Sequence, residues 1–324
     1  MLSKSATSVA TAIALFGVIA PATSQEYPTR PVKIIVQYPP GGVPDASGRL
    51  VAESLAQYFG QPFIVENRTG AGGNIGTDIV VKSDPDGYTL LLAASASLTI
   101  SPNLYKSLPF KLSNLSPVSL IGSFDFVMMT APAFGAKSIS ELVALAKSAP
   151  GKLNIASSGY GSEHHLVGEL FKLTTGAPIT HVPYKGFGPA ATDVMANHVE
   201  LMFGSIPAAS AFLQSSKMKG LAVTGNTRSP IVPHIPTFAE LGYPEIRMTS
   251  WVGLLAPAEV PRHVLEKLTA ALEKLSQSPE YTDRIAKLGL SSMPAGPKAF
   301  SEQIQADTKF WKDIITRSNI GQVE

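Results

Sequence analysis

Glycine and short polar residues gather at one place in this sequence where an anion could bind. Gly41 and Gly42 follow an apolar stretch over residues 32–36 and precede Asp45, a residue type that favours a helix N-terminus. Unpaired backbone N–H groups and the helix macrodipole both favour a negative charge at such a point. The sequence therefore predicts an anion-binding loop here, of which Pro40 is also a part. The alternative is an ordinary strand-to-helix connection that binds nothing.

Small polar residues also follow the other predicted strands. They are Ser95, Ser97, Ser157, Gly159, Ser162, Tyr184, Lys185, Gly186 and Ser205. Ligands of doubly wound sheets bind outside the carboxyl ends of the strands, so we take these residues as candidates for ligand contacts. Lys185 could pair with an anionic ligand or be a solvated surface lysine. Asp193, in the next predicted helix, could orient a bridging water or face solvent.

The adjacent histidines His164 and His165 are the strongest candidates for metal or catalytic chemistry. Glu169 follows four residues after the second, so an imidazole and a carboxylate could share one helical face. A zinc site needs a further ligand and usually the HExxH order, which the sequence lacks. No GxSxG or SxxK motif occurs, and Ser162 is too close in sequence to His165 to form a nucleophile–base pair by itself. We therefore expect no metal and no catalytic residue, and expect His165 to donate to a ligand or cap the preceding loop.

The glycine-rich segment 70–76 is close to a dinucleotide-binding fingerprint but departs from it. Ile75 occupies the position where the fingerprint requires its last glycine, and no acidic residue ends the following strand to bind a ribose. A tight backbone turn accounts for these glycines better. We expect no cofactor.

Composition narrows the class of protein. The chain has 324 residues, of which 44% are hydrophobic, and a formal net charge of +2. This length suggests two domains, and the near-neutral charge without a block of like charges does not point to nucleic acid. The absence of cysteine excludes disulfides, thiolate metal sites and a cysteine nucleophile.

Residues 1–24 have the features of a secretory signal peptide. Lys4 precedes a short apolar run, and Ala22 and Ser24 supply small residues before a cleavage point next to Gln25. The alternative is an uncleaved N-terminal anchor. No other segment has the roughly 20 apolar residues that a membrane-spanning helix needs, so we expect a mature protein exported to the bacterial periplasm.

The remaining pattern predicts an α/β fold of two doubly wound lobes joined by two crossing strands. Strands and helices alternate, which favours parallel sheets. The expected strands are 32–36, 62–65 and 88–93 in the first lobe, 153–156, 179–182, 199–203 and 221–224 in the second, and crossing strands over 116–130 and 251–257. We place lobe 1 at 25–122 with 253–324 and lobe 2 at 123–252. Helices over 261–276, 280–287 and 301–318 are expected to cover lobe 1.

Six motifs stand in an order that resembles one known family. They are YPTRPV (27–32), GGVPD (41–45), VENR (65–68) with GAGG (70–73), PDGY (85–88), HVPYKG (181–186) and PT (236–237). This order is similar to that of the tripartite tricarboxylate transporter substrate-binding proteins, also called the Bug or TctC family, over essentially the whole mature chain.

The resemblance implies a monomeric periplasmic binding protein with a clamshell, type II-like fold. Such a protein captures a small carboxylate by lobe closure and delivers it to a transporter with a large and a small integral subunit. In the family, backbone N–H groups, hydroxyls and ordered waters from loops of both lobes hold the carboxylate. By motif, the water-bridging first loop corresponds to Gly41, Gly42 and Asp45, and the other strand-end residues named above fall in the remaining ligand loops. Pro40 and Val43-Pro44 depart from the family pattern, stiffen the first loop and remove a possible donor.

The sequence leaves open which ligand is bound and which membrane protein recognises the liganded form. A di- or tricarboxylate, an acidic amino acid and an aromatic carboxylate all fit an anion-binding loop. Phe124, Tyr160, Phe187 and Phe203 could line a pocket that accepts aromatic ligands or could pack in the core. A membrane receptor that senses the ligand is an alternative to a permease as the partner. A secreted hydrolase using Ser162 and His165 is a remote alternative.

Overall fold

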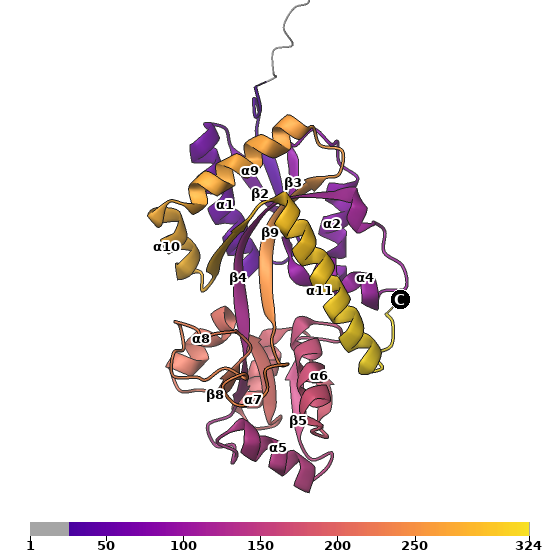
Figure 1. Cartoon of the computed structure of the whole chain (residues 1–324), viewed down its shortest axis with the longest axis vertical. Helices are drawn as coiled ribbons and strands as arrows, with labels where there is room; N and C mark the ends of the chain where they lie inside the picture. The colour runs from indigo at the N-terminus through magenta and orange to yellow at the C-terminus, as the bar shows by residue number, and fades with distance from the viewer. Residues whose placement is uncertain (1–25, 324) are drawn as a thin grey trace, which may run out of the picture.

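Two long strands join an upper and a lower lobe in the computed structural model, which describes residues 26–323 (Figure 1). These strands are β4 (Leu115–Thr130) and β9 (Thr249–Pro257). At about 3.3 Å per residue, the 16 residues of β4 are long enough to run through both lobes. β4 pairs with β9 as far as Asp125 and with β7 from Phe126 onward. The predicted signal peptide, residues 1–24, lies outside the described residues.

The upper lobe is built on a sheet that is parallel at one edge. Its strands are β1 (Val32–Val36), β2 (Phe63–Asn67), β3 (Thr89–Ala94) and β10 (Ser291–Ala295), together with β4 and β9. β1 pairs in parallel with β2 and β3, whereas β9 is antiparallel to β3 and β10 to β4. The helices of this lobe are α1 (Val43–Phe59), α2 (Asn74–Val81), α3 (Ser95–Thr99), α4 (Ser101–Leu104), α9 (Arg262–Ser276) and α10 (Pro279–Lys287), with short 3-10 turns at Ala71–Gly73 and Leu112–Asn114.

The lower lobe repeats the arrangement. Its strands are β5 (Asn154–Ser157), β6 (Thr180–Pro183), β7 (Leu201–Ser205) and β8 (Lys219–Val223), and its helices are α5 (Ile139–Ser148), α6 (Glu163–Thr175), α7 (Phe187–Met195) and α8 (Ile206–Gln214). β5 is parallel to β6 and β7, and the end of β4 is antiparallel to β7 and β8. The predicted α/β class with two crossing strands is confirmed. The exact lobe boundaries, 25–122 with 253–324 and 123–252, stay a prediction.

Each lobe is built around a hydrophobic core, and the core of the lower lobe also takes in Ile100 and Leu104 of the upper lobe. In the upper lobe, buried residues of β1 and β3 such as Ile34 and Leu92 pack against α1 and α9. In the lower lobe, Phe171 of α6 packs against Phe203 of β7 and Phe238. Largely distinct cores allow each lobe to hold its shape while the strands between them bend.

The first strand-to-helix connection differs in detail from the prediction. The N-cap of α1 is Gly42, and Asp45 lies in the first turn of the helix instead of at its cap. α1 packs closely on the sheet at Gly48, where an added Cβ would lie 2.7 Å from Cγ2 of Val36. The helix ends at Gly60, whose φ of 69° is typical of a left-handed C-cap.

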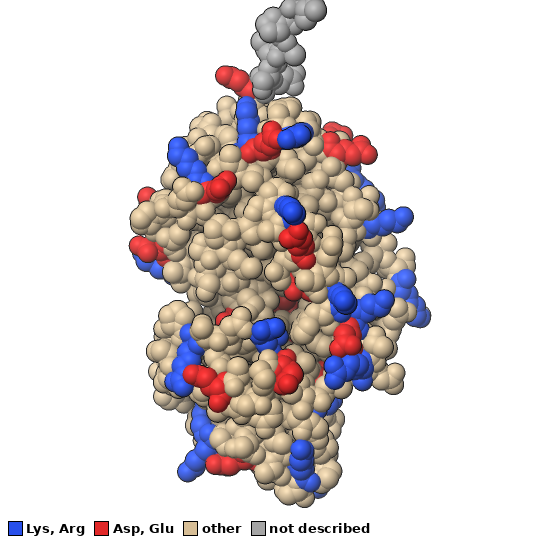
Figure 2. Space-filling model, in the orientation of Figure 1, with Lys and Arg blue, Asp and Glu red and all other residues tan. Residues whose placement is uncertain are grey.

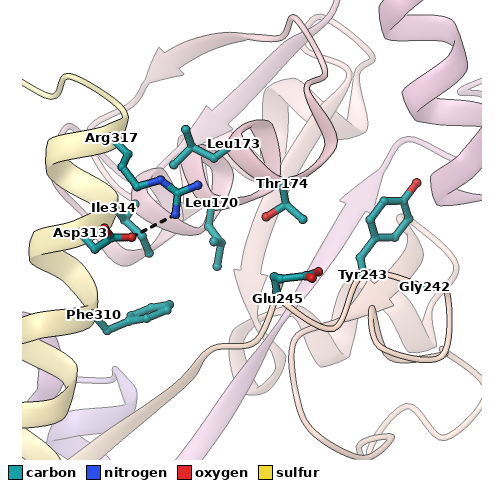
Figure 3. Close-up of a pocket in the computed structure, with 10 residues that line it drawn as sticks. All are labelled: Leu170, Leu173, Thr174, Gly242, Tyr243, Glu245, Phe310, Asp313, Ile314 and Arg317. Atoms are coloured by element: carbon teal, nitrogen blue, oxygen red, sulfur yellow. Dashed lines mark hydrogen bonds and ion pairs between the residues drawn. The ribbon is translucent and has the colours of Figure 1, made fainter.

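Helix α11 (Pro297–Arg317) was predicted to cover the upper lobe, but it also reaches the lower one (Figure 1). Phe300, at its start, is buried against Trp251 of β9, whereas Trp311 and Ile314 join the hydrophobic core of the lower lobe. A groove of about 590 Å³ lies between the end of α11 and the lower lobe (Figure 3). α11 is therefore a third connection between the lobes.

Among residues 26–323, no helix is long and apolar enough to span a membrane.

Candidate functional site

A cavity of about 890 Å³ lies between the lobes and receives residues from both. The upper lobe and the part of β4 that pairs with β9 contribute Tyr38, Pro39, Pro40, Gly42, Val43, Pro44, Gly72, Ala94, Ala96, Ile100, Ser101, Leu104, Tyr105 and Phe124. The lower lobe contributes Phe126, Ser158, Gly159, Tyr160, Gly161, Ser162, Glu163, His164, Phe187, Gly188, Ser205 and Ala208. A cavity of this size can enclose a small organic ligand.

Four of the helices with eight or more residues begin at this cavity. Their N-caps are Gly42 for α1, Ser162 for α6, Gly186 for α7 and Ser205 for α8, and in each case residues of the cap or first turn line the cavity. No side chain caps α1, α7 or α8. The first N–H groups of a helix have no partner within the helix, so these ends present donors and a positive partial charge. Their convergence favours an anion between the lobes.

The cavity lining carries no Lys or Arg, and Glu163 is its one acidic residue among residues 26–323. Burial raises the pKa of Glu163, against hydrogen bonds from Ser95 and Ser250 that lower it. Burial also lowers the pKa of His164 to about 4, so this imidazole is neutral at pH 7. On the molecular face drawn in Figure 2, Lys and Arg are interspersed with Asp and Glu, without a large patch of one sign. An anion would therefore be held by local backbone groups, not by a cationic side chain.

Glu163 links the two lobes beside the cavity. The hydroxyl of Ser95, at the start of α3 in the upper lobe, donates to Oε1 of Glu163 at 2.5 Å. Ser95 also lies 2.9 Å from the hydroxyl of Ser250 on β9. The first residue of α6 is thus tied to a strand end and to a crossing strand.

The loop before α6 is held by its own hydrogen bonds. The Ser162 hydroxyl accepts from the His165 N–H and donates to the Gly159 carbonyl at 2.7 Å. The Ser158 hydroxyl lies 2.7 Å from Nδ1 of His164. Gly161 lies so close to Leu104 of the upper lobe that any side chain would collide with it. The loop therefore contacts the opposite lobe at the cavity.

Asp45 holds the first loop in position through its hydrogen bonds. Its carboxylate accepts hydrogen bonds from the Gly41 N–H at 3.0 Å, from Nδ2 of Asn67 at 2.9 Å and from Arg49 at 3.0 and 3.1 Å. Burial alone would raise the pKa of Asp45, but these bonds outweigh it and hold the pKa below its usual range. Asp45 thus fixes the loop that carries Pro40 and Gly42 into the cavity.

Aromatic rings line the cavity near the point where β4 passes from the upper lobe to the lower one. Phe124 and Phe126 of β4 have centroids 5.8 Å apart. His164 meets Phe126 edge-on at 5.4 Å and lies 5.9 Å from Phe187 of α7. Phe124, Phe187 and Tyr160, which the sequence left undecided between pocket and core, line the cavity, whereas Phe203 is buried in the lower core.

The predicted site residues fall into two groups. Pro40, Gly42, Gly159, Ser162 and Ser205 line the cavity. The other predicted residues lie outside its lining: Gly41, Asp45, Ser95, Ser97, Ser157, His165, Tyr184, Lys185, Gly186 and Asp193. Gly41, Asp45, Ser95 and Gly186 lie next to lining residues along the chain or through the contacts described above.

Several residues outside the lining have clear structural partners instead. Ser97 donates to Gln37 at 2.9 Å, and the hydroxyl of Tyr184 donates to Asp193 at 2.7 Å. His165 stacks on His181 with centroids 3.7 Å apart.

The catalytic and metal alternatives find little geometric support around His165. Its Nδ1 accepts from the Gly161 N–H, and its Nε2 lies 3.6 Å from Glu169, so its ring does not reach the Ser162 hydroxyl. No group of three His, Asp or Glu able to hold a metal occurs within residues 26–323.

The prediction overlooked residues that the structure brings to the cavity, notably Tyr38, Ser158, Glu163 and His164. Ser158 was adjacent to a predicted residue. The spacing of His165 to Glu169 does indicate that these two share a helix face, which leaves His164 on a different side of α6. Tyr38 carried no comparable signal.

Comparison with known proteins identifies the family. A sequence model of the tripartite tricarboxylate transporter family receptors, TctC, matches residues 48–320. The protein BugT of Bordetella pertussis is 38% identical over 305 residues, which cover 94% of each chain. A solved R. palustris protein with adipate has a TM-score of 0.83 and 29% identity over 92% of this chain and all of that one. MatC from Rhodopseudomonas palustris, solved with bound malate, has a TM-score of 0.77 and 28% identity over 89% of this chain and all of that one. The chain therefore belongs to the TctC, or Bug, family of tripartite tricarboxylate transporter receptors.

Proposed function

We propose that this protein binds a small carboxylate reversibly between its lobes. The observation that carries the proposal is the convergence of the α1, α6, α7 and α8 N-termini on a cavity without Lys or Arg in its lining. Such helix ends supply hydrogen-bond donors and partial positive charge, which suit a carboxylate. The relatives solved with adipate and with malate support a carboxylate as the ligand class.

The protein acts as a monomeric extracytoplasmic solute-binding protein, not as an enzyme. It is exported to the periplasm after cleavage near Ser24 and Gln25, and delivers its ligand to a membrane transporter with a large and a small integral subunit. Membership in the transporter receptor family supports this role, as does a similar solved structure, the periplasmic binding protein BugD, with a TM-score of 0.79 and 30% identity over 92% of this chain and all of that one.

Ligand binding closes the lobes about β4 and β9. The largely distinct cores of the two lobes support a rigid-body motion, and the contacts of Glu163 with Ser95 and of Gly161 with Leu104 supply surfaces that meet across the cavity. Closure removes the carboxylate from water and strengthens its hydrogen bonds.

Isothermal calorimetry and thermal unfolding with a panel of carboxylates test the proposal. A ligand that binds only the folded state raises the melting temperature, so at least one carboxylate should do so and its amide or alcohol counterpart should not. If no carboxylate binds, the proposal fails.

A charge introduced at a helix end gives a sharper test. Ser205→Asp places a carboxylate at the N-cap of α8 in the cavity, where it competes with an anionic ligand, and should lower affinity at least tenfold. Ser138→Asp makes the same change at the N-cap of α5, away from the cavity, and should leave affinity unchanged. Equal affinities in the two variants would contradict the proposed position of the ligand.

The partner of this protein is a permease in our proposal and a sensory membrane receptor in the alternative. Pull-down of membrane proteins with liganded and with empty protein separates them. Capture of the two integral transporter subunits supports delivery, whereas capture of a sensory membrane receptor instead would contradict delivery and favour sensing.

A further inference from the structure

The polar and apolar parts of the cavity lining are segregated, which bears on the kind of carboxylate that fits. Most of the polar lining belongs to the lower lobe, in the segment 158–164 and at Ser205. The upper-lobe lining is largely apolar apart from the hydroxyls of Tyr38, Ser101 and Tyr105, and its aliphatic side chains come from the first loop, α3 and α4. A dicarboxylate with one carboxylate facing each lobe would need hydrogen-bond donors on both sides of the cavity.

The first loop of the upper lobe is poor in donors because of its own sequence. Pro39, Pro40 and Pro44 line the cavity and have no backbone N–H, and Val43 offers an aliphatic side chain at the first position of α1. Ile100 and Leu104 extend this apolar wall. Without a Pro44 N–H, the α1 N-terminus offers one donor fewer than a helix end without proline, so a second carboxylate there would be compensated less fully for its lost hydration.

The lower lobe retains the donors that one carboxylate needs. The first turn of α6, Glu163-His164-His165, contains no proline, and Ser162 uses only the N–H of His165. Ser158 and Ser205 add hydroxyls to the same side of the cavity. One carboxylate can therefore be seated at the α6 end.

The remaining volume is bordered by flat rings at the crossing between lobes. Phe124, Phe126, His164 and Phe187 follow one another at centroid distances of 5.4 to 5.9 Å. Burial lowers the pKa of His164 to about 4, so its ring is uncharged at neutral pH and is not a counter-ion, and its buried Nε2 has no hydrogen-bond partner among the described residues. Ring pairs at such distances prefer offset or edge-to-face contact, a geometry that a further aromatic ring can join.

We propose that the ligand of this protein is an aromatic monocarboxylate, with its carboxylate at the start of α6. Its ring lies between the proline-rich first loop and the rings of Phe124, Phe126, His164 and Phe187. This inference rests on the proposed function, because it specifies the substrate class of that same site. Aliphatic di- and tricarboxylates are expected to bind more weakly, since their additional charges would face the apolar upper wall.

A matched ligand panel tests the inference by calorimetry. Benzoate should bind at least tenfold more tightly than adipate, succinate and citrate. Cyclohexanecarboxylate, which has the same charge but no aromatic ring, should bind about 3- to 10-fold more weakly than benzoate, as expected when a favourable ring contact is lost. Benzamide, which keeps the ring without the charge, should give no thermal shift.

Ring-specific variants show whether the contact lies where we place it. Phe187→Leu keeps apolar volume but removes the ring, so it should weaken benzoate about fivefold and leave cyclohexanecarboxylate unchanged. Phe310→Leu makes the same change on α11, outside the cavity lining, and should alter neither affinity. If Phe187→Leu weakens both ligands equally, or neither, the aromatic contact is wrong.

A gain of binding provides the complementary test. Val43→Ser with Pro44→Ala restores a hydroxyl and a backbone N–H to the first loop, and should narrow the preference for benzoate over adipate at least threefold. An unchanged preference would contradict the role given to this loop.

The outcomes separate this inference from the proposed function. If an aliphatic di- or tricarboxylate binds as tightly as benzoate, the aromatic assignment fails and carboxylate binding stands. If no carboxylate in the panel binds, the proposed function itself fails. Equal binding of benzamide and benzoate would overturn the position of the carboxylate.

Discussion

Replacement of Asp45 by asparagine tests whether the first loop is preorganised from beneath. The Asp45 side chain is only 6% exposed and is an acceptor for Gly41, Arg49 and Asn67. The substituted amide would keep one acceptor oxygen and turn an NH2 group toward donors, so at least one of these donors loses its partner. We expect weaker ligand binding as well as lower stability, because the loop positions Pro40 and Gly42 at the cavity.

The size of the effect follows from the partners of Asp45. A hydrogen bond to a charged group contributes about 1.5–3 kcal/mol. The Arg49 side chain is 56% exposed, so solvent screens its share, and the bonds from the Gly41 N–H and Asn67 carry most of the loss. We expect Asp45→Asn to lower the free energy of unfolding by about 2 kcal/mol, which corresponds to about 3 °C in melting temperature at an unfolding entropy of about 2.1 cal/mol/K per residue.

The pH dependence adds an independent signature. The pKa of Asp45 is lowered in the folded protein, so its stabilisation is present above the unfolded pKa and is lost as the pH falls through the folded one. The difference between wild type and Asp45→Asn should therefore shrink below about pH 4.

An exposed pair of the same spacing provides the control for Asp45→Asn. Asp313 and Arg317 are also separated by four residues on a helix, but their side chains are 60% and 55% exposed. Exposed pairs contribute about 0–1 kcal/mol, so Asp313→Asn should change the melting temperature by little. Equal effects of the two substitutions, or an Asp45→Asn effect that is the same at every pH, would refute the reasoning.

Three further predictions concern other parts of the chain. Glu163→Gln should keep the contact with Ser95 but make stability depend less on pH in the mildly acidic range. The pKa of Glu163 is raised in the folded protein, so its stabilisation is present below the unfolded pKa and is lost as the pH rises through the folded one. Melting temperatures measured across this pH range test the prediction. Gly161→Ala should collide with Leu104 and force a left-handed backbone position on alanine, so X-ray scattering should show more open lobes and calorimetry a weaker ligand. Ser138→Ala should remove the N-cap of α5 and lower the free energy of unfolding by about 1 kcal/mol in chemical denaturation, without change in ligand affinity.

Local patterns in the sequence were sufficient for most of the fold. The apolar run at 32–36 predicts β1, and α1 and α6 end at Gly60 and Gly176, a residue type that is typical of helix C-termini. The crossing strands were also predicted, from the apolar runs at 116–130 and 251–257. Such signals depend on residues close in sequence, so no tertiary information is needed to interpret them.

Tertiary structure decided which polar residues reach the cavity and where α11 ends. The sequence marks Ser157, Ser158, His164 and His165 alike as strand-end or helix-start residues, but only Ser158 and His164 line the cavity. Their neighbours point into the lower lobe, where Ser157 lies 2.7 Å from His181 and His165 stacks on that same ring. The amphipathic pattern of α11 likewise predicts a helix but not that its far end would pack on the lower lobe. Sequence periodicity determines which face of an element is apolar, whereas contacts between residues far apart in the chain determine what that face meets.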